Sequence, residues 1–108
     1  MDEKRYQVLA DEALRAIETM LEHVDAEDVD LERAGDVLTL TFQNGKKAVV
    51  NTQRPTRQIW LAANARAWHF SYDESSSRWN DDKGQGVELC RQVAAIVKEQ
   101  AGIEVTPR

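Results

Sequence analysis

Apolar residues recur every three or four positions near both ends of the chain, and this spacing predicts two amphipathic helices. The first should span about residues 4–24 and the second about residues 85–101, where Gly102 is a natural stop. The apolar side of the first helix consists of Tyr6, Leu9, Ala10, Ala13, Ile17, Met20, Leu21 and Val24. The apolar side of the second consists of Val87, Cys90, Val93, Ala94, Val97 and Ala101.

Between these segments apolar and polar residues alternate, which predicts five or six β-strands. We expect them at about residues 29–32, 37–42, 46–51, 58–63, 67–72 and 78–80. Turn signals such as Gly35-Asp36 and Asn44-Gly45 separate them, so consecutive strands should form antiparallel hairpins. The fold class is therefore α+β. We predict a single domain over residues 1–108, a two-layer α/β sandwich of the order helix–strands–helix with both helices on one sheet face.

Trp60 is the large aromatic residue whose position this pattern leaves most open. In the strand after Pro55, Ile59 and Leu61 should point to one face while Gln58 and Trp60 point to the other. Periodicity alone allows a helix to cover the Trp60 face. With both helices on the opposite face, Trp60 instead faces water, where an amphipathic aromatic ring is a typical binding anchor.

Acidic residues are concentrated in the first third of the chain. Residues 1–32 hold 11 of the 19 acidic residues and three of the 14 basic ones, a net charge of −8, whereas residues 33–108 carry a net charge of +3. A polyanion would be repelled by the first third, and cations or a basic protein surface would be attracted to it. We therefore expect no nucleic-acid partner.

The remaining composition is that of a soluble globular protein, with 42% hydrophobic and 31% charged residues. No apolar run approaches the length of a membrane span, and the segment Met1-Asp2-Glu3-Lys4 lacks the apolar stretch of a signal peptide. The single cysteine excludes an internal disulfide and a cysteine-only metal site. We expect a cytoplasmic protein with no membrane partner.

No catalytic constellation is evident. His23 and His69 fall on separate elements without an obvious Ser or Cys partner, and Cys90 lies on the apolar side of a predicted helix, as a buried thiol would. The segment Gly84-Gln85-Gly86 lacks the other residues of a phosphate-binding loop. We predict that the protein is not an enzyme.

Carboxylates are the remaining candidate for a site, because the first helix and the strand beside it should gather them along one edge. They are Asp11, Glu18, Glu22, Asp25, Glu27, Asp28, Asp30 and Glu32. Oxygen ligands suit hard cations such as Mg²⁺, Ca²⁺, Mn²⁺ and Fe³⁺ and tolerate Fe²⁺. Their spacing matches no EF-hand loop, so a metal site would be open and weak. A docking surface for a basic protein, or a plainly solvated face, explains the same residues.

Four of these carboxylates should share one side of the first helix: Asp11, Glu18, Glu22 and Asp25. Neither Glu18 nor Glu22 has a Lys or Arg four residues later to neutralise it, and anions near a helix C-terminus oppose the macrodipole. This acidic ridge should therefore cost local stability unless another group compensates for it.

Two longer patterns carry a resemblance to a known family. One is the segment Gly35-Asp36-Val37-Leu38-Thr39-Leu40-Thr41-Phe42, which follows the acidic run 18–32 and precedes the Asn44-Gly45 hairpin. The more specific one is Asn51-x-Gln53-x-Pro55-x-x-Gln58-Ile59-Trp60-Leu61-Ala62, followed by His69-Phe70. Over essentially its whole length the chain resembles the short bacterial members of the frataxin family.

This resemblance implies an α-β sandwich with two helices across one sheet face and a role in iron–sulfur cluster assembly as a regulator or adaptor. It implies that the acidic ridge binds iron (Fe²⁺ or Fe³⁺) weakly and docks on the cysteine desulfurase. It further implies that the open sheet face contacts the assembly machinery, including the scaffold protein, through Asn51, Gln53, Gln58 and Trp60. We expect a monomer, with iron-driven oligomers as a further state.

Thr19 and His23 depart from the resemblance, because bacterial relatives often carry acids at these positions. This ridge therefore has fewer charges, which bears on its affinity for iron more than on docking. Two other functions remain as alternatives: an iron storage or ferroxidase-type protein, and an acidic interaction module without a metal role. The ferroxidase type normally needs Glu-x-x-His motifs, and position 20 before His23 is Met while position 66 before His69 is Arg.

Overall fold

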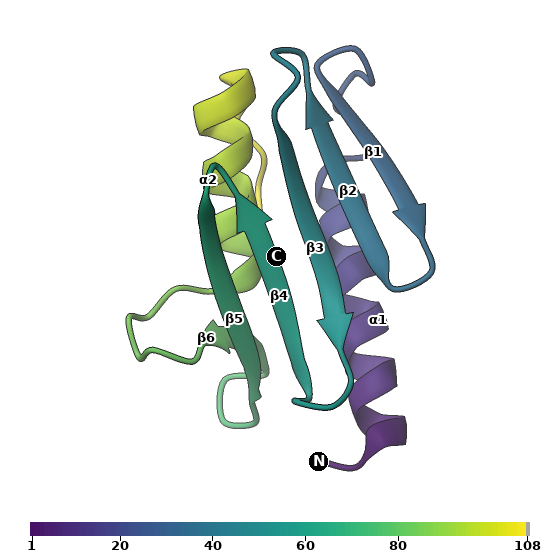
Figure 1. The fold of residues 1–108 in the computed structure, drawn as a ribbon, viewed down its shortest axis with the longest axis vertical. Helices are drawn as coiled ribbons and strands as arrows, with labels where there is room; N and C mark the ends of the chain where they lie inside the picture. Colours follow the sequence, from purple (N-terminus) through teal and green to yellow (C-terminus); the bar gives the residue numbers. More distant parts are fainter. Residues whose placement is uncertain (108) are drawn as a thin grey trace.

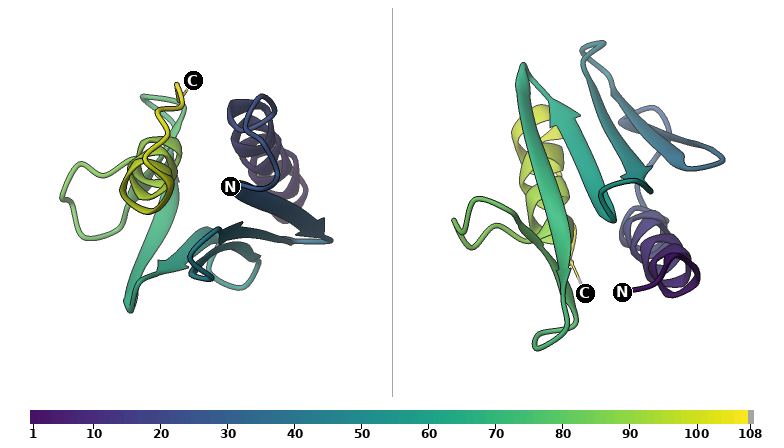
Figure 2. Two further views of the ribbon diagram at one scale, coloured as in Figure 1. Left: turned by 90° about the horizontal axis from the view of Figure 1, so that it is seen from above. Right: turned by 60° about the horizontal axis from the view of Figure 1, so that its bottom comes forward.

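The structure, a computed structural model, describes residues 1–107. Helix α1 (Glu3–Met20) is followed by six strands and helix α2 (Leu89–Ala101). The strands are β1 (Val29–Ala34), β2 (Val37–Phe42), β3 (Lys47–Gln53), β4 (Gln58–Ala63), β5 (Arg66–Asp73) and β6 (Arg78–Asp81). They form one antiparallel sheet in sequence order, and both helices lie on the same face of it (Figures 1 and 2). The predicted α+β sandwich, with six strands, is confirmed.

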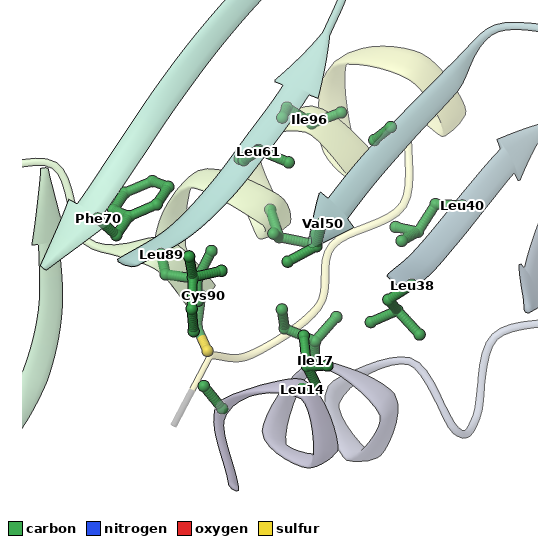
Figure 3. Packing of buried hydrophobic residues seen from close by; sticks show 14 of the residues in the cluster. Leu14, Ile17, Leu38, Leu40, Val50, Leu61, Phe70, Leu89, Cys90 and Ile96 are labelled. Carbon is green, nitrogen blue, oxygen red and sulfur yellow. The ribbon is translucent and has the colours of Figure 1, made fainter. Parts of the chain in front are cut away.

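The hydrophobic core lies between the sheet and the two helices (Figure 3). Strand alternation places one set of side chains toward the helices, and its large, fully buried members are Leu38, Leu40, Val50, Ile59, Leu61 and Phe70. From the helices, Leu14, Ile17, Leu89 and Val93 close the core. The other sheet face is left uncovered, so residues of the opposite parity on β3 and β4 reach the surface.

Helix α1 ends at Met20, four residues before its predicted end at Val24. Its last turn contains no basic residue, and Glu18 and Glu22 place negative charge at the end where the macrodipole disfavours it. The chain leaves the helix in a turn that still delivers Leu21 to the core. The apolar residues after Met20, whose spacing predicted a longer helix, therefore lie in a turn.

Helix α2 begins at Leu89, about four residues later than predicted. The cap is Glu88, whose carboxylate accepts hydrogen bonds from the backbone N–H groups of Cys90 and Arg91. The Asp81 carboxylate accepts hydrogen bonds from the backbone N–H groups of Gln85 and Val87 and so stabilises the loop that precedes the helix. The buried side of α2 also includes two residues absent from the predicted stripe, Leu89 and Ile96.

Two of the hairpin turns set the register of the central strands. Gly45 adopts a left-handed φ of 85° in the Asn44-Gly45 turn, and Asn44 Oδ1 accepts a hydrogen bond from the Lys46 N–H. Between β4 and β5, Asn64 and Ala65 both have positive φ, the conformation of a tight two-residue hairpin. That turn brings Trp60 directly opposite His69.

After α2 the chain turns at Gly102, whose φ is 68°. The tail then runs back along the helix layer, where Ile103 and Val105 pack against the core. No helix within residues 1–107 combines the length and apolar character needed to cross a membrane.

Candidate functional site

The eight candidate carboxylates lie around the edge of the sheet formed by β1 and the adjoining helix α1 (Figure 1). They do not form one continuous ridge on one helix face, because Glu22 and Asp25 lie beyond the end of α1. The structure divides them into three groups. Asp11 and Glu18 are on α1, Asp30 and Glu32 are on β1, and Glu22, Asp25, Glu27 and Asp28 lie in the connection between the two, which we call the acidic corner.

Asp11 and Glu18 are both held by Arg33 of β1. Arg33 Nη1 lies 2.8 Å from Glu18 Oε1, and Nη2 donates to Asp11 Oδ1. The three side chains are half-buried, with Arg33 at 25% exposure, and hydrogen bonding to Asp11 is the main cause that raises the pKa of Arg33. Asp11 also pairs with Arg15 at 2.9 Å, one helical turn away. Glu18 has no cation four residues later, as the sequence shows, and the compensation that the sequence analysis left open comes from another element.

The acidic corner is mostly exposed. Its backbone is organised by Asp25, whose carboxylate accepts a hydrogen bond from the Glu27 N–H at 2.8 Å. His23 Nε2 lies 3.5 Å from Glu22 Oε1, with the imidazole 93% exposed. A groove of about 660 Å³ separates the corner from the C-terminal tail at Ile103–Thr106. The corner thus presents carboxylates to solvent on a short, internally hydrogen-bonded segment.

Asp30 and Glu32 point to the uncovered side of β1. Their antiparallel partners are Thr41 and Thr39, which also face outward, whereas Arg33 belongs to the helix-facing set. The alternation predicted for this strand is confirmed. These two acids consequently face away from the Asp11 and Glu18 pair, although all four lie near the same sheet edge.

The carboxylates fit a hard cation by chemistry but not as a ready-made cage. Carboxylate oxygens are the donors such ions prefer. Within residues 1–107, however, no three Asp, Glu, His or Cys side chains converge closely enough to hold a metal ion. Any cation bound here would therefore draw on few protein ligands and many waters, which is the arrangement of a weak site.

The four residues predicted on the open sheet face do lie together there. Asn51 is directly opposite Trp60 across the β3–β4 pair, and Gln53 is directly opposite Gln58. The Trp60 Nε1–H donates to Gln58 Oε1 at 3.0 Å. The interpretation in which a helix covers Trp60 is excluded, since both helices pack on the other face (Figure 2).

Sequence reasoning missed how Trp60 is supported by its neighbours. Its indole stacks on the imidazole of His69, with ring centroids 4.3 Å apart and planes 19° from parallel. Gln58 Nε2 donates to Asp82 Oδ2 at 3.1 Å, and that same oxygen is 3.8 Å from His69 Nδ1. The Trp60 side chain is therefore half-buried and held in one orientation. The two-residue turn Asn64-Ala65 could have predicted this contact, because a turn of that length places Trp60 opposite His69.

Arg33 was also missed as a member of the acidic edge. The predicted strand stopped at Glu32, whereas β1 continues to Ala34. Extending the alternation by one residue would have placed Arg33 on the helix-facing side with Val29 and Leu31. Its two carboxylate partners are 15 and 22 residues away in the sequence, so the contact itself follows only from packing α1 across β1.

Comparison with known proteins gives one consistent result. Residues 1–103 match the family model of the frataxin-like domain. The chain is 40% identical over 104 residues to the iron–sulfur cluster assembly protein CyaY of Pseudomonas fluorescens, covering 96% of this chain and 93% of that one. It is 38% identical to the protein of that name from Paraburkholderia phymatum, over 99% and 100% of the two chains. A frataxin structure from Psychromonas ingrahamii superposes with a TM-score of 0.87 at 32% identity, over 97% and 96% of the two chains.

Proposed function

The chain belongs to the frataxin-like family, and from that premise we propose that it serves iron–sulfur cluster assembly as a non-catalytic adaptor that docks on the cysteine desulfurase. Its bacterial relatives carry the name iron–sulfur cluster assembly protein. The docking surface would be the acidic edge at α1 and β1. The observation that carries this proposal is the acidic corner, where Glu22, Asp25 and Glu27 are exposed on adjacent turns.

Charge and position both suit this corner to docking. A partner with a basic patch would be steered toward it, because residues 1–32 concentrate a net charge of −8 while the whole chain carries −5. Exposed carboxylates also retain their hydration until a partner arrives, so complementary Arg or Lys side chains can pair with them in a salt-sensitive way. We infer that the corner mainly attracts and orients the partner, and that contacts buried on binding contribute less there.

Iron enters this proposal as weakly held cargo and not as a resident cofactor. Glu22, Asp25, Glu27 and Asp28 supply oxygen donors that a ferrous or ferric ion accepts, and their exposure leaves room for bound water. A yeast frataxin structure described as complexed with ferrous iron shares this fold at 23% identity, with a TM-score of 0.68. Iron on this corner would lower its negative charge, so metal and a basic partner would oppose one another at the same surface.

The open sheet face would provide the second contact. Trp60 is pre-oriented by its stack on His69 and its hydrogen bond to Gln58, which reduces the conformational entropy lost when a partner binds. Asn51 and Gln53 flank it with amide donors and acceptors. We propose that this face contacts the assembly complex, including the scaffold protein, once the acidic edge has docked.

Charge reversal at the corner tests the docking proposal. The double variant Glu22→Lys with Glu27→Lys should weaken binding to the purified desulfurase at least about tenfold, since two attractive charges become repulsive. The control is Glu74→Lys with Glu99→Lys, which changes the net charge equally on the β5–β6 turn and on α2; because it breaks the exposed Arg5–Glu74 ion pair, its fold is checked by circular dichroism. The readout is the dissociation constant by calorimetry at two salt concentrations. Equal affinity of both variants and the unmodified protein would overturn the proposal.

The storage or ferroxidase alternative gains no specific support from the described residues. A di-iron centre needs several carboxylates and imidazoles converging on one point. The two imidazoles here lie apart, since His23 is on the exposed corner and His69 stacks on the open sheet face. We therefore carry the adaptor function forward.

A further inference from the structure

Arg33 is a cation placed within the acidic edge by the fold itself. It extends from the helix-facing side of β1 to two carboxylates on α1, which lie seven residues apart on the same side of that helix. Glu18 receives one terminal nitrogen and Asp11 the other, so both arms of the guanidinium are used. The candidate carboxylates are thus unequal, because two already have a tightly held cation.

This arrangement favours Arg33 over any cation from solution. Two charge-assisted hydrogen bonds from a planar fork are stronger and more directional than contacts from a flexible ammonium group. The guanidinium side chain is only 25% exposed, so solvent and salt screen the pair less than they screen the 56%-exposed Glu22. Because Arg stays protonated at any ordinary pH, mild acidification or alkalinisation does not remove the positive charge that occupies these two carboxylates.

We propose that Arg33 is an internal counter-cation that withholds Asp11 and Glu18 from external cations and thereby restricts binding to the acidic corner. The proposal rests on the proposed function in that the same edge is taken to attract iron and a basic partner. It makes Arg33 a specificity-determining residue, which sets where on the edge a divalent cation is held and how many carboxylates are available to it.

Removal of Arg33 should create a binding position that the unmodified protein lacks. A small cavity of about 230 Å³ already lies beside the pair, and its lining includes Asp11, Arg33 and Asp36. With a neutral side chain at position 33, Glu18 would lose its cation partner, and Asp11 would keep only the solvent-exposed Arg15. A divalent cation would replace the lost positive charge, and hard ions with oxygen preference are the class that this position would favour.

The test uses Mn²⁺ as an air-stable, paramagnetic hard cation added to the ¹⁵N-labelled protein. Spectra are compared for the unmodified chain, for Arg33→Gln and for Arg78→Gln, which removes one positive charge on β6 at the opposite edge of the sheet. In Arg33→Gln, amide signals near Asp11 and Glu18 should broaden at about tenfold lower Mn²⁺ than in the other two proteins. That factor follows from removing one nearby positive charge at the surface.

The outcomes separate this proposal from the function on which it rests. Selective broadening near Asp11 and Glu18 in Arg33→Gln supports the internal counter-cation, whether or not the acidic corner responds in the unmodified protein. Equal behaviour of Arg33→Gln and Arg78→Gln overturns it, even if the corner binds Mn²⁺ in all three. The response of the corner in the unmodified chain, and desulfurase binding, bear on the proposed function alone.

A second variant covers the case in which Arg33→Gln lowers stability. Arg33→Lys keeps the positive charge but cannot span both carboxylates with a rigid fork, so it should retain the fold and give broadening at an intermediate Mn²⁺ concentration. Circular dichroism and thermal melting confirm that each variant is folded. The proposal is also contradicted if both variants are folded and neither shows new Mn²⁺ broadening near Asp11 and Glu18.

Discussion

Trp60 shows what strand alternation reveals about a single residue and what it leaves out. The pattern Gln58-Ile59-Trp60-Leu61 placed the indole on the face opposite Ile59 and Leu61 but left open whether a helix covers that face, and the position of both helices on the other side shows that none does. The stack on His69 depends instead on the register between β4 and β5, which is set by a turn whose second residue, Ala65, has an unusual positive φ. Alanine is uncommon at such a turn position, so the sequence predicted the register between β4 and β5 less clearly than it predicted the alternation within β4.

Replacing Trp60 by Ala should separate binding from folding. The side chain lies on the open face, so we expect the loss of its stack to lower the free energy of unfolding by about 1 kcal/mol. Binding to the assembly complex should fall at least about tenfold, as for a truncated aromatic anchor. Thermal melting and calorimetry measure the two effects. A loss of several kcal/mol in stability with unchanged binding would assign Trp60 to the core instead.

Cys90 provides a second prediction at this scale. Burial raises the pKa of its thiol to about 12, so at pH 8 the native protein should hold it protonated and unreactive. A raised pKa means that the folded state binds the proton more tightly. The corresponding stability is full below the ordinary pKa of about 9 and is lost as the pH rises toward 12.

A thiol-specific disulfide reagent measures this directly. At pH 8 we expect slow labelling of the native protein and rapid labelling of about one thiol per chain in denaturant. Rapid labelling without denaturant would show that the helix layer over Cys90 opens readily or that the thiol is exposed.

At the scale of elements, the apolar pattern predicted which segments are helical or extended, whereas local charge and capping decided where the helices begin and end. Helix α1 stops at Met20 although its apolar spacing continues to Val24, because acids accumulate where the helix dipole disfavours them. The compensation of Asp11 and Glu18 comes from Arg33, a residue of the next element. Neighbouring residues in the sequence do not reveal that partner. The sequence therefore predicted that the carboxylates lie along one edge, but not which of them are paired with Arg33 and which are exposed.

Charge reversal at two neighbouring acids should have opposite effects on stability. Glu22→Lys removes an exposed anion beyond the end of α1 and should raise the free energy of unfolding by about 0.3–1 kcal/mol. Glu18→Lys should lower it, since Arg33 would then face a second cation at half-buried depth. Urea denaturation of both variants under identical low-salt conditions makes the comparison. A stabilising effect of Glu18→Lys would show that the Arg33 pair adds nothing to the fold.

At the scale of the whole molecule, the fold separates two surfaces with different chemistry. The acidic edge lies at β1 and α1. Trp60 and the amide side chains of Asn51, Gln53 and Gln58 lie on β3 and β4, the central strands of the open sheet face (Figure 1). The first offers long-range attraction that salt should weaken, and the second offers short-range contacts that salt should scarcely affect. A partner of the proposed kind would therefore associate through the edge and be retained through the sheet.

The central claim is that the acidic edge is the site at which both iron and the desulfurase engage this protein. An amide-resonance titration of the labelled chain tests it most directly, first with ferrous iron under anaerobic conditions and then with the desulfurase. We predict that both titrations remove signals within residues 11–32, most strongly in the acidic corner at residues 22–28, and that iron affects the signals around Asp11 and Glu18 least, because Arg33 occupies those carboxylates. Loss of signals only on α2 or on the open sheet face, or no response to either addition, would contradict the claim.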